Sequence, residues 1–327
     1  MKLNGFLIAC FLLIGQRTDA QFFNVEEKPF SFEAGISLGP MNAFTDLGGR
    51  RGNGQTGAKD FNIKNTKLYG SVYFSTTFLD LFSVRLEATR GGVKSNDSLL
   101  ENVKGSAIGR YTRNLSFRSA ISEVTITLEL HPLVLVGSAD PDAAVSPYVL
   151  GGFGYFHFNP QAMLNGQWID LRPLHTEGQG FQEFPERREY KLNQLNIPLG
   201  AGIRYQLSNA FNFRLEYITR KLNTDYLDDV STTYIEPALF SKYLSGTNLT
   251  NALILNNRVR PNTPSNTTTA RPGGQRGDPK DNDHYFTINL KIGYKFGNGG
   301  GGSGHDFRST LDGRPKMGKH LLCPKRF

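Results

Sequence analysis

Apolar and polar residues alternate with a period of two over much of the chain. In one example, Val124, Ile126 and Leu128 share a face, and threonine and glutamate residues take the other. Side chains of a strand point alternately to its two faces, so each such segment predicts a β-strand with one apolar and one polar face. The pattern is clear in residues 30–39, 82–89, 123–130, 195–205, 211–217 and 286–296.

Two further segments, 67–78 and 148–158, are rich in aromatic residues and glycine. In these segments the alternation of odd and even positions does not show which side chains point inward. The two segments bring the number of predicted strands to eight. Short connections at 76–81 and 206–210, and a middling one at 131–146, alternate with long ones at 42–66, 91–118, 159–192 and 222–284. Strands of about ten residues with this loop asymmetry predict an all-β fold, an eight-stranded antiparallel up-and-down transmembrane barrel with its long loops outside the cell.

The polar faces of these strands carry many charged residues. Five are acidic and six are basic: Glu33, Glu87, Glu123, Glu129 and Glu216, with Arg85, Arg204, Arg214, Arg220, Lys291 and Lys295. A barrel of eight strands is only wide enough to be filled by side chains. The near balance of charge therefore predicts a charge-paired plug in the lumen and not an open pore.

Parity alone does not say which face points inward. A secreted lipocalin-like barrel would also alternate, with its apolar residues inside. Aromatic residues stand at the ends of the apolar faces, among them Phe30, Tyr205, Tyr217 and Phe296. Such residues form the interfacial girdles of membrane barrels. We therefore favour an OmpA/OmpX-like barrel in the outer membrane of a Gram-negative bacterium.

The two ends of the chain differ from the barrel segment. Residues 1–20 have the lysine, the apolar run and the small residues before Gln21 that are typical of a cleavable signal peptide. A lipoprotein cleavage at Cys10 is not favoured, because the apolar run before it would be too short. We expect the barrel within 21–296, a glycine-rich linker at 297–304 and a basic periplasmic tail at 305–327. Candidate partner contacts in this tail are Cys323, Pro324, Lys325, Arg326 and Phe327.

Charge and composition narrow the class of partner. The formal net charge is +8, but an export signal argues against nucleic acid. We therefore expect contact with outer-membrane lipid and lipopolysaccharide. After the N-terminal run, no stretch approaches the roughly 18 apolar residues that a membrane-spanning helix needs.

Candidate chemistry is sparse, and we expect no cofactor and no metal. The six histidines show no metal-binding spacing. Asp225, Asp228 and Asp229 could bind Ca²⁺, yet they lack the glycine and terminal glutamate of an EF-hand loop, so we favour carboxylates that accept backbone N–H groups. His175 and Glu177 could act as an acid–base pair in a lipid-modifying barrel enzyme. No nucleophile stands beside them, and we favour a non-enzymatic protein.

Four stretches, 113–119, 147–160, 168–180 and 224–231, resemble the DUF6089 family of Bacteroidota outer-membrane barrels, and the closing residues 323–327 resemble the end of that family. The loop residues that carry this resemblance are Trp168, Arg172, Pro173, Glu177, Gly178, Gly180, Asp225, Tyr226, Asp228 and Asp229. Loop 236–284 carries no family motif.

The resemblance implies an outer-membrane barrel. For its PorG-like members it implies a role in anchoring or assembling the periplasmic ring proteins of the type IX secretion and gliding machinery. Family membership does not fix the function, because many paralogues have no established role. A small-solute channel, a general envelope protein and a lipid-modifying enzyme stay open as alternatives.

Overall fold

The computed structural model describes residues 30–48, 63–78, 81–100, 107–135, 145–208, 210–260 and 271–296. The expected signal peptide, the glycine-rich linker and the basic tail lie outside these residues. The strands are β1 (Phe30–Phe44), β2 (Lys67–Phe78), β3 (Phe82–Asn96), β4 (Ser116–Leu130), β5 (Val145–Leu164), β6 (Gln167–Asp170), β7 (Asn193–Gln206), β8 (Phe211–Leu222) and β9 (His284–Phe296). The α-helices are α2 (Ala107–Arg113), α3 (Pro132–Leu135), α4 (Phe240–Tyr243) and α5 (Gly246–Asn256), and short 3-10 turns span Ile63–Asn65, Asp97–Leu100, Arg172–Leu174 and Pro237–Leu239.

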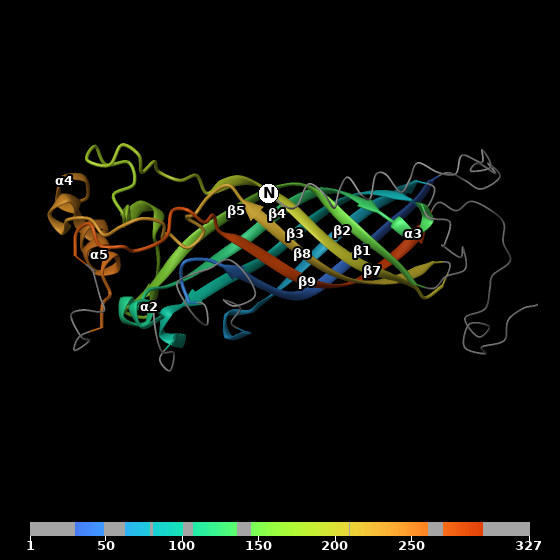
Figure 1. Ribbon diagram of the computed structural model, residues 1–327, viewed down its shortest axis with the longest axis horizontal. Helices are drawn as coiled ribbons and strands as arrows, with labels where there is room; N and C mark the ends of the chain where they lie inside the picture. The colour runs from blue at the N-terminus through green and yellow to red at the C-terminus, as the bar shows by residue number, and fades with distance from the viewer. Residues whose placement is uncertain are drawn as a thin grey trace, which may run out of the picture.

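Eight of the strands form one closed ring. The strand order is β4-β3-β2-β1-β9-β8-β7-β5, and a β4–β5 pairing closes it. Every pairing is antiparallel, and Figure 1 shows the strands inclined to the barrel axis. The short strand β6 pairs only with the far end of β5, as a hairpin outside the ring. The predicted eight-stranded antiparallel barrel is confirmed.

The barrel wall is apolar outside and charged inside. Leu86, Ile126 and Leu290 are 53%, 53% and 58% exposed on the outer face, whereas Arg85 and Lys291 are fully buried in the lumen. A band of apolar side chains facing outward is stable only against lipid tails. The structure thus confirms the membrane-spanning orientation, and the lipocalin-like alternative is wrong.

The structure also resolves the two strands whose facing parity left open. In β2, Val72 and Phe74 point outward, and Tyr73 points into the lumen. In β5, Phe153 is exposed on the outer face and Tyr148 is buried inside. These strands therefore contribute aromatic rings to both faces.

Several strands continue far beyond the apolar band, and here our loop boundaries were wrong. β1, β3 and β4 take residues that we assigned to the loops at 42–66 and 91–118, and β5 and β6 extend into 159–192. In these extensions the inner face becomes apolar. Met41, Val93, Phe117, Ile121 and Phe158 belong to one buried core that the loops complete. Outside the bilayer the outer face meets water, so the outer face becomes polar and the inner face apolar. The period-two pattern within the bilayer therefore does not predict the facing of these extensions.

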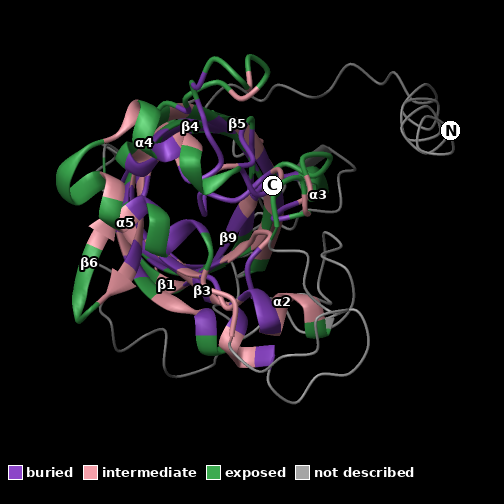
Figure 2. Ribbon diagram, turned by 90° about the vertical axis from the view of Figure 1, so that its left-hand side faces the viewer, coloured by how far each residue is buried: buried purple, intermediate pink, exposed green. Residues whose placement is uncertain are grey.

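The two ends of the barrel differ in construction. At the short-turn end, aromatic rings line the outer rim, with Phe30 5.1 Å from Phe78 and Phe211 5.2 Å from Tyr294 between ring centroids. The loops and helices α2, α4 and α5 lie at the opposite end, around the mouth of the barrel (Figures 1 and 2). No helix among the described residues is long and apolar enough to cross a bilayer.

Candidate functional site

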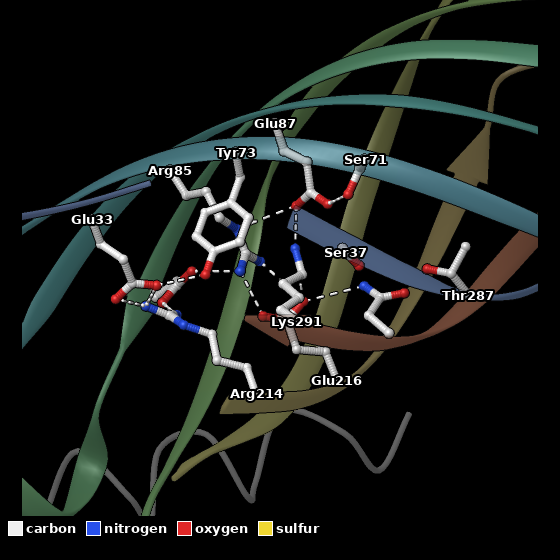
Figure 3. A network of polar contacts seen from close by, with 12 residues as sticks. Glu33, Ser37, Ser71, Tyr73, Arg85, Glu87, Arg214, Glu216, Thr287 and Lys291 are labelled. Atoms are coloured by element: carbon white, nitrogen blue, oxygen red, sulfur yellow. Dashed lines mark hydrogen bonds and ion pairs between the residues drawn. The ribbon is translucent and has the colours of Figure 1, made fainter. Parts of the chain in front are cut away.

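The lumen holds a continuous network of ion pairs, centred on Arg85 of β3. Its Nη1 atom lies 2.5 Å from Oε1 of Glu216 on β8 and 2.9 Å from Oε1 of Glu129 on β4. Its Nε atom is 3.5 Å from Glu87 on the same strand. One guanidinium therefore connects carboxylates from opposite walls of the barrel (Figure 3).

A second arginine shares one of these carboxylates. Arg214 of β8 lies 2.7 Å from Oε2 of Glu129 and 2.9 Å from Glu33 of β1. The hydroxyl of Tyr73 donates to Glu33 at 2.7 Å. Glu129 thus bridges the two buried arginines, and the fork of each guanidinium contacts two strands at once.

Lys291 extends the network along the axis toward the loops, and Arg220 forms a separate ion pair beyond it. The Lys291 ammonium contacts Glu87 and lies 3.2 Å from Glu216. Arg220 donates to Glu123 at 3.2 Å and is 2% exposed. The structure therefore brings the five predicted lumen carboxylates together with four of the six predicted cations.

The remaining two cations lie near the short-turn end. Arg204 is 9% exposed and is the cross-strand neighbour of Arg214. Lys295 lies beside Glu33 across the β1–β9 pair, and its ammonium donates to Gln206 at 2.9 Å. Lys295 is only partly buried, so it belongs to the rim of the lumen.

Tyrosines complete the network, although the alternation of the strands did not predict them. Tyr148 donates to Glu216, Tyr69 donates to Asn289, and Tyr285 donates to Glu123 at 2.9 Å. Tyr69 and Tyr148 belong to β2 and β5, the two strands whose inward face the sequence pattern did not predict. Buried carboxylates need several donors each, and a phenol supplies one without adding charge.

We call the loops and helices at the end opposite the short turns the cap. The cap is organised around the buried carboxylate of Glu177, one of the family-motif residues. It accepts the backbone N–H groups of Ser231 at 3.1 Å and Thr232 at 2.8 Å. Arg276 lies 2.9 Å from it, and both side chains are almost fully buried. Glu177 therefore joins three loop segments that are distant in the sequence.

Two neighbouring aspartates of the 224–231 motif hold further segments in place. Asp228 accepts from the backbone N–H of Leu47 at 3.1 Å and of Val230 at 2.9 Å, as expected for a loop-start carboxylate. Asp229 instead accepts from the side-chain hydroxyls of Thr176 and Tyr190, at 2.5 and 2.7 Å. Asp228 follows our interpretation, and Asp229 departs from it because two hydroxyls approach it, one from Thr176 in the 168–180 stretch and one from Tyr190 further along the chain.

The other motif residues shape the same cap. Arg172 donates to the Tyr190 carbonyl at 2.9 Å, and the Tyr190 ring stacks on Tyr226 at 5.1 Å. Pro173 lies in the first 3-10 turn after β6. Gly178 and Gly180 have φ of +73° and +82°, the left-handed region that favours glycine. Trp168 lies on β6, outside the cap.

Four cap aspartates share an environment that disfavours their charged forms. Burial and the Asp46 charge raise the pKa of Asp225 to about 9, and burial raises the pKa of Asp46 to about 6. Burial followed by neighbouring aspartates raises the pKa of Asp228 and Asp283 well above the ordinary value. Negative charges that lie together in a low-dielectric site favour protonation.

His175 and Glu177, the acid–base pair that we considered and did not favour, have different partners in the structure. His175 contacts the Gln179 carbonyl through Nδ1, and Glu177 is engaged by Arg276 and backbone donors. Within the described residues, no three His, Cys, Asp or Glu side chains are arranged to hold a metal ion. The tail candidates, residues 323–327, lie outside the described part of the chain.

Comparisons with known proteins give the fold alone. No family model and no curated protein matches the chain. The attachment invasion locus protein of Yersinia pestis aligns at 11% identity over 81% of this chain and 99% of its own, with a TM-score of 0.35. Neisserial surface protein A aligns at 8% identity over 82% and 98%, with a TM-score of 0.36. Outer membrane protein W of E. coli aligns at 13% identity over 83% and 100%, with a TM-score of 0.32.

Proposed function

We propose that this chain is a non-enzymatic outer-membrane barrel of a Gram-negative bacterium that anchors or helps to assemble periplasmic components of a type IX-like secretion or gliding machine. The observation that carries the proposal is the packed lumen. Arg85, Arg214 and Lys291 are buried among carboxylates across the width of the barrel. The barrel then serves to hold the protein in the membrane, and the surfaces outside the membrane are the ones that bind partners.

The placement of the family-motif residues supports the same proposal. Glu177, Asp228 and Asp229 are buried and engaged in holding loops together, which is a structural role and not a catalytic one. The resemblance to the DUF6089 family supplies the secretion machinery as the partner class. The motifs would then preserve the barrel that presents a partner surface.

The periplasmic side is the proposed partner side. β1 begins and β9 ends at the same short-turn rim, where Phe32 pairs with Phe296. A chain that leaves β9 there enters the periplasm when the long loops face outward. The basic tail at 305–327 would then extend toward periplasmic ring proteins.

Affinity purification from the native envelope tests this proposal. A tagged chain lacking 305–327 should insert at the normal level and lose its periplasmic partners. A control keeps the tail and neutralises two exposed lysines elsewhere, Lys191 before β7 and Lys221 on β8, and should retain the periplasmic partners. Unchanged co-purification after the deletion, together with normal secretion in a strain lacking the protein, would rule the proposal out.

A further inference from the structure

The outer wall carries a group of positive charges on the side formed by β2, β3 and β4. We name it the basic wall patch; its members are Lys67, Arg90, Lys94 and Arg118. Lys94 and Arg118 are direct cross-strand partners, and Arg90 lies further down the same face of β3. The Lys67 side chain passes over the outer side of Gly92, within electrostatic reach of Lys94 and Arg118.

The height of the patch places it at the lipid headgroups. On β3 the outward residues run from Phe82 through Leu86 to Arg90 and Lys94. With a rise of about 3.3 Å per residue and a tilt of about 40°, each residue climbs about 2.5 Å along the membrane normal. Arg90 then lies about 20 Å and Lys94 about 30 Å above the short-turn rim, which brackets the top of an apolar band about 25 Å tall.

The patch is held in position by neutral partners. Arg118 donates to Gln161 at 3.0 Å, and its guanidinium lies 3.8 Å from the centre of the Trp168 ring. Arg90 donates to Ser122. The carboxylate of Asp170 on β6 accepts from Asn159 and Gln161, at 3.0 and 2.7 Å. In the described part of the chain, none of the four cations forms an ion pair with a carboxylate.

We propose that the basic wall patch binds the phosphate groups of a phosphorylated glycolipid of the outer leaflet, of the lipid A class. Arginine and lysine form charge-assisted hydrogen bonds with phosphate, and four cations match a headgroup that carries more than one phosphate. Below the patch, the outward faces of β3 and β4 present Leu86, Val124 and Ile126 to acyl chains. The inference requires only that the barrel spans the outer membrane, and it is independent of the anchoring role.

Binding of purified lipid A to the full chain in neutral detergent tests the proposal. The double variant Lys94→Gln, Arg118→Gln should bind bisphosphorylated lipid A at least about tenfold more weakly, because two charge-assisted contacts are lost. The charge-preserving variant Lys94→Arg should stay within about threefold of the unmodified chain, since this position keeps its cation and Arg118 is left unchanged. Migration on unheated gels shows that each variant is folded before it is used.

A control away from the patch removes the same amount of charge. Lys191→Gln, Lys221→Gln changes two exposed lysines; β8, which carries Lys221, is diametrically opposite β3 in the ring, and Lys191 precedes β7. This control should bind lipid A as the unmodified chain does. Equal weakening in the control, equal affinity for dephosphorylated lipid A, or equal affinity for phosphatidylglycerol would each overturn the proposal.

Discussion

At the scale of single residues, the lumen depends on compensated charge. Arg214 is fully buried against Glu33 and Glu129, so its removal leaves Glu33 without its cation and Glu129 with Arg85 as its remaining arginine. We expect Arg214→Met to lower the free energy of unfolding by about 3–5 kcal/mol, the usual cost of leaving a buried charge uncompensated. Denaturant titration of the refolded barrel in lipid vesicles measures it.

The control for this prediction is Lys295→Met at the lumen rim. Lys295 is partly exposed and donates to the neutral amide of Gln206. Its replacement should cost less than about 1 kcal/mol, as for an exposed polar contact. A loss of similar size in both variants would show that the lumen responds to any removed cation and that the ion pairs have no special weight.

At the scale of elements, the cap should depend on pH through its aspartates. The pKa values of Asp46 and Asp225, about 6 and about 9, exceed the ordinary 3.8, so the folded cap favours the protonated carboxyls. A raised carboxyl pKa contributes stability that is present below the ordinary value and lost as the pH rises through the folded value. We expect amides of segments 224–231 and 271–283 to exchange at least about tenfold faster at pH 9 than at pH 5, after correction for intrinsic rates.

Substitution separates this effect from general alkaline instability. Asp225→Asn removes one titrating group and should flatten the pH dependence of cap exchange. Asp281→Asn changes an exposed aspartate within segment 271–283 and should leave the dependence as it was. A cap that is equally protected at both pH values would contradict the assigned protonation.

The strands also show how much of the fold could be predicted from the sequence. Alternation such as Val124-Thr125-Ile126 predicted six of the eight strands and the grouping of charge on one face, because one environment lies on each side of the wall within the bilayer. The facing came from the aromatic residues at the strand ends. It failed at Phe117 and Ile121, which point inward, because above the bilayer water replaces lipid outside and an apolar core replaces charge inside. Tyr148 went unassigned because an aromatic ring with a hydroxyl suits either face.

The cap was predictable only in part. Asp228 sits where a loop-start carboxylate was expected, since its partners Val230 and Leu47 include a neighbour in the sequence. The Glu177–Arg276 pair joins residues far apart in the chain, and no local pattern marks it. The family resemblance singled out Glu177 but not its partner.

At the scale of the whole molecule, the central claim is a membrane barrel whose lumen is closed by its own ion pairs. Steady single-channel conductance in planar lipid bilayers tests it most directly. Protein whose insertion is verified by gel migration and protease protection should show no stable open level, because buried pairs such as Arg85 with Glu216 and Arg214 with Glu129 fill the lumen. A large, stable current from the inserted barrel would contradict the account.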